Sequence, residues 1–197
     1  MPHRFKFKLH PTAISISSVA VLSLYGFSNQ GFSMIGNTKN KAVVTSYSPQ
    51  MAAFLATIRW AETGTSGYES YRKLVFNGTF NDFSTHPKVR QCARVSGRNV
   101  CSTAAGAYQM LDISWNDLQP DLGLKDFSPP SQDKMAIEYI RRNKAVDDVK
   151  SGNVEMAFCK VGKVWASLIC NDYNQNAKSI EELTKYYNSQ LNIYQGR

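Results

Sequence analysis

The sequence lacks several features that mark common classes of function. Its four cysteines form no Cys-x-x-Cys pair, the spacing typical of zinc sites and thioredoxin-type redox sites. Outside the short N-terminal run RFKFK, it has no strongly basic helix and no alternation of aromatic and basic residues, which argues against a nucleic-acid partner. No segment is repeated along the chain. We therefore expect no metal, no cofactor and no nucleic acid.

Acidic residues are absent from the first 50 positions, which carry five basic residues. The rest of the chain has 18 basic and 15 acidic residues, so the N-terminal segment supplies most of the formal net charge of +8. The charge excess therefore favours a targeting segment over a basic binding surface.

An uncharged stretch, residues 11–27, follows the basic start MPHRFKFKLH. It is short for a membrane span, which needs roughly 20 apolar residues. This order is typical of a secretory signal peptide, and Ser28 offers a small residue for cleavage. We interpret residues 1–28 as the signal peptide, 29–47 as a linker and 48–197 as the folded domain. A marginal membrane anchor and a soluble amphipathic tail are the alternatives.

Such a segment predicts export to the periplasm or cell envelope, with transient membrane association through residues 11–27 before cleavage. Four cysteines in an exported chain indicate two disulfides, for which three pairings exist. Cys92 and Cys101 bracket a predicted hairpin and are the favoured pair. Cys159 and Cys170 can pair only if the helix between them stops, because eleven helical residues span roughly 16 Å. Free buried thiols are the alternative.

Apolar spacing and capping residues predict a mostly helical chain of the α+β class. Ser48 and Pro49 mark the start of the first helix. Its apolar stripe consists of Met51, Phe54, Leu55 and Ile58. Further helices are expected over residues 112–118, 128–142, 153–168 and 179–191. Short runs between glycine and asparagine turns predict a small antiparallel sheet within residues 68–111.

Glu62 extends the apolar stripe of the first helix by one further step of four residues. At the C-terminal end of a helix, apolar surroundings and the helix dipole both disfavour a charged carboxylate. Both effects predict a raised pKa, which suits a general acid. The alternative is a structural carboxylate that pairs with an arginine or binds loop amides.

Two loops carry residues that suit a sugar ligand. Small residues follow Ser102 and allow a ligand to lie close to the backbone. Tyr108 and Gln109 then offer a stacking surface and amide hydrogen bonds. The loop NDYNQN has Tyr173 at its centre. An ordinary turn is the alternative interpretation of each loop.

Several of these motifs occur together in one order: RWAETGT, STAAGAYQM, LGLKDFSPPSQD and VWASLICNDYNQ, with FNDFSTHPK as a further match. Their order and approximate spacing resemble those of the phage lambda type of lysozyme, or endolysin. The resemblance covers roughly residues 50–192 and implies a lysozyme-like fold. It also implies the activity of the lambda protein, which is a lytic transglycosylase that cleaves bacterial cell-wall glycan.

The resemblance implies that Glu62 is the catalytic glutamate. The substrate-binding residues that it implies are Ser102, Tyr108, Gln109, Tyr173 and Gln175. Of these, Gln175 matches only by its place in the loop. Asp82 lies in a matching motif, and we expect it to support structure more than chemistry. The segment QCARVSGRNVC replaces the mobile lip of the lambda-type groove, and the N-terminal extension is a further departure.

The implied reaction cleaves the β-1,4 bond between N-acetylmuramic acid and N-acetylglucosamine in peptidoglycan glycan strands. One glutamate acts first as acid and then as base, and a 1,6-anhydromuramic acid end forms. A muramidase is an alternative, because the sequence does not exclude Glu69, Asp82 or Asp112 as a second carboxylate. A non-catalytic peptidoglycan-binding protein is another. We expect a monomer.

Overall fold

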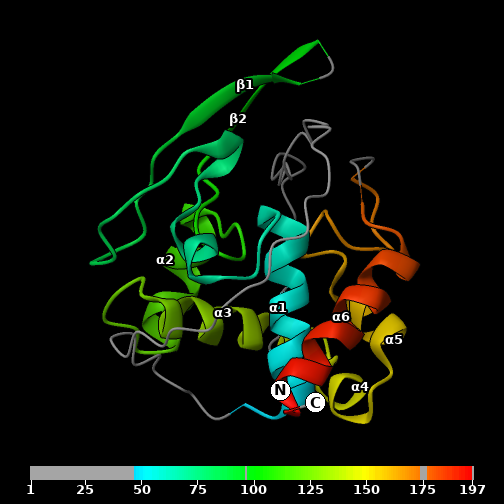
Figure 1. The fold of residues 1–197 in the computed structure, drawn as a ribbon. Helices are drawn as coiled ribbons and strands as arrows, with labels where there is room; N and C mark the ends of the chain where they lie inside the picture. Colours follow the sequence, from blue (N-terminus) through cyan, green and yellow to red (C-terminus); the bar gives the residue numbers. More distant parts are fainter. Residues whose placement is uncertain (1–46, 96, 174–176, 197) are drawn as a thin grey trace, which may run out of the picture.

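The computed structural model describes residues 47–95, 97–173 and 177–196. Within them, a hairpin of two strands projects from a body of helices (Figure 1). The elements in chain order are α1 (Pro49–Thr63), η1 (Tyr68–Arg72), η2 (Val75–Asn77), β1 (Gln91–Val95), β2 (Arg98–Ser102), α2 (Asp112–Asp121), α3 (Pro129–Arg142), α4 (Val146–Ser151), α5 (Val154–Val161) and α6 (Ile180–Tyr194). The predicted α+β class is confirmed.

Helix α1 runs through the middle of the fold (Figure 1). It begins where predicted, since Pro49 occupies its first turn and the Met51 amide donates a 3.3 Å hydrogen bond to the Ser48 hydroxyl. It ends at Gly64, whose φ of 79° is a left-handed conformation that favours glycine. The predicted apolar stripe is confirmed as buried core: Met51, Phe54, Leu55 and Ile58.

Helix α6 packs against α1 and closes one side of the body (Figure 1). Its predicted start is confirmed, because the Glu182 amide donates to the Ser179 hydroxyl at 3.2 Å and the Ser179 amide donates to the Glu182 carboxylate at 2.9 Å. Trp60 of α1 stacks on Tyr186 of α6 with ring centroids 4.4 Å apart. This contact joins the two helices near the end of α1 that carries Glu62.

Strands β1 and β2 form the hairpin that the cysteine spacing predicted. Cys92 lies directly opposite Cys101 in the antiparallel register, with Cα atoms 4.0 Å apart, and the two form a disulfide. The favoured pairing is confirmed.

The prediction of further strands within residues 68–111 is wrong. Residues 68–72 and 75–77 form the short 3₁₀ helices η1 and η2. Isolated bridges replace longer strands, such as Ala105 with Met110. Contacts between segments that are far apart in the sequence determine this conformation. The Val75 amide, for example, donates to the Ala104 carbonyl at 3.0 Å.

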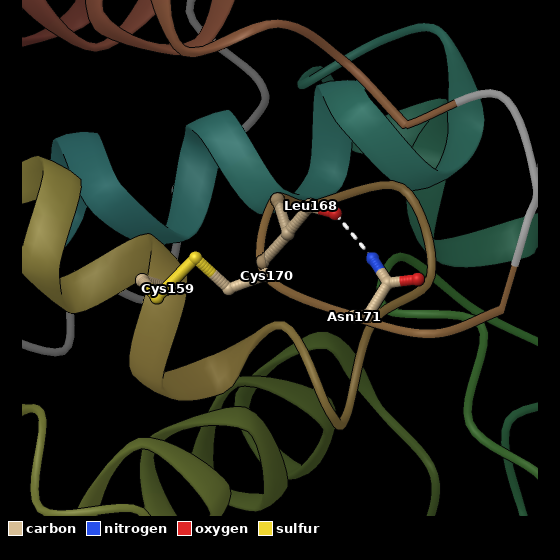
Figure 2. The surroundings of a disulfide bond; sticks show 4 residues. All are labelled: Cys159, Leu168, Cys170 and Asn171. Atoms are coloured by element: carbon tan, nitrogen blue, oxygen red, sulfur yellow. Dashed lines mark hydrogen bonds between the residues drawn. A yellow bond between two sulfur atoms is a disulfide. The ribbon is translucent and has the colours of Figure 1, made fainter.

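The predicted helix over residues 153–168 stops early, because α5 ends at Val161. A Cβ at Gly162 would collide with the Ile169 carbonyl oxygen, so only glycine allows the chain to fold back so closely. The reversal brings Cys170 to Cys159, with Cα atoms 4.9 Å apart, and the second disulfide forms (Figure 2). The alternative of free thiols is therefore wrong.

No helix among the described residues is long and apolar enough to cross a membrane. The predicted signal peptide and nearly all of the predicted linker lie outside the described residues. Those interpretations stay predictions.

Candidate active site

Glu62 lies in the last turn of α1 and is almost completely buried, with 1% of its surface exposed. The Ser167 hydroxyl, itself 1% exposed, donates a hydrogen bond to Glu62 Oε1. Ser167 belongs to the chain segment that folds back after α5. The predicted burial of Glu62 is confirmed, and its partner Ser167 was not predicted by any sequence pattern.

A small pocket opens beside this carboxylate. Its lining consists of Glu62, Thr63, Lys73, Leu74, Val75, Phe76, Asn77 and Gln109. Among the described residues of this lining, Glu62 is the only acidic one. Of the predicted site residues that the structure describes, the pocket brings together Glu62 and Gln109.

Three non-glycine residues of the lining have a left-handed backbone, with φ of 57° at Phe76, 69° at Asn77 and 46° at Gln109. Such conformations cost energy for residues with a side chain and are often found at functional sites. The pocket therefore combines a buried carboxylate with a strained rim.

Gly106 and Gln132 fix the turn that presents Gln109. Gly106 has φ of 77°, and a Cβ there would collide with the Gln132 side chain. Gln132 Oε1 accepts a hydrogen bond from the Ala107 amide at 2.8 Å, and the Gln109 side chain donates to the Gly106 carbonyl at 2.9 Å. Ser102 lies at the start of this segment, buried, and its hydroxyl accepts from the Ala104 amide. It shapes the loop and is not part of the pocket lining.

The structure contradicts the prediction that Tyr108 offers a stacking surface to a sugar, because this side chain is 0% exposed. Its hydroxyl donates to Asp133 at 2.6 Å and accepts from Arg59 at 3.0 Å. Burial raises the pKa of Tyr108 well above its ordinary value, so the hydroxyl stays protonated and able to donate. Tyr108 anchors the turn that holds Gln109.

A buried polar cluster of Arg59, Tyr71, Tyr108 and Asp133 supports this turn. Tyr71 donates to the same Asp133 oxygen at 2.8 Å, and Arg59 lies 3.8 Å from it. Burial raises the pKa of Asp133, while Arg59 and the two tyrosine hydroxyls oppose that rise. No sequence pattern predicted this cluster. The one available signal was Arg59, a lone cation between apolar neighbours on α1.

The second predicted loop is tied to α5 by the Cys159–Cys170 disulfide (Figure 2). Within it, the Asn171 side chain donates to the Leu168 carbonyl (Figure 2). Tyr173 is half-buried, and its hydroxyl donates to the Lys163 carbonyl at 2.7 Å. It is not part of the pocket lining, and Gln175 lies outside the described residues.

The other candidate carboxylates have local structural partners. Asp82 is exposed and accepts hydrogen bonds from the amide and hydroxyl of Ser84, which lower its pKa. These hydrogen bonds hold the local turn, and the structural role expected for Asp82 stays a prediction. Glu69 accepts from the Thr65 hydroxyl, and Asp112 accepts from Thr103.

A family model described as endolysin matches residues 52–193. The chain belongs to the endolysin family. One endolysin, from Escherichia phage P2, is 41% identical over 106 residues, which are 53% of this chain and 64% of that protein. The chain thus spans just under two thirds of the P2 endolysin. The endolysin of Escherichia phage lambda is 34% identical over 131 residues, covering 64% of this chain and 81% of that protein.

Solved endolysin structures share the fold. Bacteriophage lambda lysozyme complexed with a chitohexasaccharide has a TM-score of 0.68 and 30% identity, covering 75% of this chain and 97% of that one. A second structure of lambda lysozyme has a TM-score of 0.59 and 25% identity, covering 78% and 96%. The predicted family and the lysozyme-like fold are confirmed.

Proposed function

We propose that this chain cleaves glycosidic bonds of peptidoglycan, with Glu62 as its acid–base residue. The observation that carries the proposal is a carboxylate, 1% exposed, at the edge of a pocket whose described lining contains no other acid. Burial disfavours the charged form of a carboxylate, and the C-terminal end of α1 adds a negative dipole. A protonated Glu62 is therefore a suitable general acid. Membership of the endolysin family supports the same activity.

Glu62 as the single carboxylate of the described pocket lining favours a lytic transglycosylase over a hydrolase. Hydrolases of glycosidic bonds use two carboxyl groups, about 5–5.5 Å apart for retention or about 6.5–9.5 Å apart for inversion. In the proposed reaction, Glu62 protonates the glycosidic oxygen as the bond breaks. The resulting carboxylate then takes the proton of the C6 hydroxyl of the muramic acid residue. That oxygen attacks the anomeric carbon, and a 1,6-anhydro end forms without water.

Glycan strands are the proposed substrate, which would lie along the pocket beside Glu62. A related lysozyme has been solved in complex with a chitohexasaccharide, a β-1,4-linked oligomer of N-acetylglucosamine, which is one of the two sugars of peptidoglycan glycan. The Gln109 side chain and the strained segment 76–77 are the groups that we propose contact the sugar. Tyr173 and Gln175 stay predictions as further contacts.

The test is mass spectrometry of the soluble products released from purified peptidoglycan by the wild type and by Glu62→Gln. We expect wild-type products one water lighter than ordinary muropeptides. Glu62→Gln should reduce the rate by at least about 100-fold, because acid–base catalysis is typically worth about 10²–10⁴ in rate. Binding of chitohexasaccharide should be retained by the variant.

Glu69→Gln is the matched control, because it makes the same chemical change at an exposed residue outside the pocket lining. It should keep wild-type activity. Products with ordinary reducing ends would identify a muramidase and contradict the transglycosylase step alone. A fully active Glu62→Gln would contradict the assignment of Glu62.

A further inference from the structure

The hairpin segment carries positive charge without any acidic residue near it in the sequence. Between Asp82 and Asp112 there is no acidic residue, and the basic ones are Lys88, Arg90, Arg94 and Arg98. All four side chains are exposed. Within the described part of the chain, none of them forms an ion pair. Their charge is therefore available to an anion outside the protein.

The disulfide and the strand register hold these cations on a defined arm. Cys92 and Cys101 are cross-linked in the middle of the ladder. Arg94 lies on the same face as Cys92, since side chains two apart in a strand share a face, and Arg90 continues that spacing just before β1. Arg98, opposite Val95, lies near the tip and on the other face of the hairpin. A fixed arm loses less conformational entropy on binding than a mobile loop.

The base of the arm is attached to the walls of the pocket beside Glu62. The Gln91 side chain packs on Gly78, where an added Cβ would lie 2.6 Å from Gln91 Nε2. Leu74, which lines the pocket, is bridged to Ala105 just beyond β2. From this base the hairpin extends away from the helical body (Figure 1). The base of the arm, next to Arg90, therefore adjoins the wall of the pocket.

We propose that the cationic arm, the hairpin β1–β2 with Arg90, Arg94 and Arg98, binds the carboxylates of the peptide stems attached to peptidoglycan. This inference rests on the proposed function for its substrate class and specifies the preferred form of that substrate. The sugar backbone of the glycan offers hydroxyl and amide groups, and a strand stripped by an amidase keeps one lactyl carboxylate close to each muramic acid ring. Each stem instead carries several carboxylates and extends them away from the ring. An arginine guanidinium matches a carboxylate with two parallel hydrogen bonds. The enzyme thus prefers glycan that carries stems over naked strands.

The experiment compares binding of three probes in the Glu62→Gln background of the full chain, where turnover does not interfere. The probes are stem-bearing peptidoglycan fragments, glycan strands stripped of stems by an amidase, and chitohexasaccharide. The variant Arg90→Gln/Arg94→Gln/Arg98→Gln should bind the stem-bearing fragments about 3- to 10-fold more weakly, because exposed ion pairs are individually weak. Binding of the other two probes should be unchanged, and added salt should reduce the difference.

The matched control is Lys125→Gln/Lys150→Gln/Lys185→Gln, which removes three exposed positive charges outside the arm. It should bind all three probes as the parent does. An equal loss on stripped and stem-bearing glycan, or no loss on either, would overturn the proposal. The triple arginine variant could instead lose adsorption to anionic phospholipid vesicles and still bind stem-bearing fragments as the parent does. That result would also overturn the proposal and assign the arm to a membrane surface.

Failure of the proposed function gives a result different from failure of the proposal for the arm. A fully active Glu62→Gln would remove the assignment of the catalytic residue. Binding of stem-bearing and stripped glycan would then be measured at low temperature, before cleavage is detectable, and the comparison would still decide whether the arm recognises stems.

Discussion

Ser167 meets Glu62 through a hydroxyl group, which has one hydrogen to donate and lone pairs to accept with. It can donate to Oε1 when Glu62 is a carboxylate and also when Glu62 is a carboxylic acid with its proton on Oε2, which leaves that proton for the glycosidic oxygen. The proposed mechanism needs both states, the acid before bond cleavage and the base after it. We infer that Ser167 is a positioning residue that holds the same carboxyl oxygen through both steps.

Ser167→Ala should lower kcat by about 10- to 100-fold with little change in KM, because a hydrogen bond to a charged group contributes about 1.5–3 kcal/mol. Loss of the donor also disfavours the ionised form of Glu62, so the alkaline limb of the pH profile should move to higher pH. Steady-state kinetics over a pH series measures both. Ser167→Thr, which keeps the hydroxyl, should recover part of the activity.

Ser70→Ala is the control for this experiment, since Ser70 is also buried and its hydroxyl binds the Gly67 carbonyl at 2.6 Å. It should affect thermal stability and leave the pH profile in place. An unshifted profile and unchanged kcat in Ser167→Ala would contradict the positioning role.

Individual site residues were predictable from the sequence only where local spacing defines them. Glu62 continues a helical stripe, so its burial follows from residues four apart. Tyr108 was assigned wrongly because its partners Arg59 and Asp133 lie 49 and 25 positions away in the chain. A polar side chain in a loop is expected at the surface unless such distant partners are known.

At the scale of elements, helix starts were predictable because their signals are local. Ser48 with Pro49 and Ser179 with Glu182 are complete capping arrangements within four residues. The end of α5 was not predictable, because the apolar spacing continues to Leu168 while the chain reverses at Gly162. The reversal brings the Ile169 carbonyl close to Gly162, and the spacing of apolar residues along the sequence contains no information about this contact.

The Cys159–Cys170 disulfide should matter more for activity than the Cys92–Cys101 disulfide, although both close loops of similar length. Replacing either pair by serine should cost about 3 kcal/mol of stability, as the chain-entropy account gives for loops of this size. Only Cys159→Ser/Cys170→Ser releases the loop with Ser167 and Tyr173 from α5 (Figure 2). Its activity on stripped glycan should fall at a temperature where both variants remain folded.

Cys92→Ser/Cys101→Ser serves as the matched comparison and should keep activity on stripped glycan, since it loosens only the cationic arm. Thermal unfolding establishes the folded fraction of each variant before the assay. Equal specific activities of the two variants would contradict a role for the second disulfide in holding Ser167 near Glu62.

At the scale of the whole molecule, the two disulfides and the proposed substrate point to the same compartment. Disulfides persist in oxidising environments such as the periplasm, and peptidoglycan lies outside the cytoplasmic membrane. Residues 1–28 are the segment that we predict to direct export.

Expression of the full chain in a bacterium with an outer membrane should therefore yield a periplasmic protein that begins at residue 29. Its intact mass should rise on reduction by the amount for two disulfides. Full-length protein in the membrane fraction would instead identify an anchor, and full-length reduced protein in the cytoplasm would contradict export.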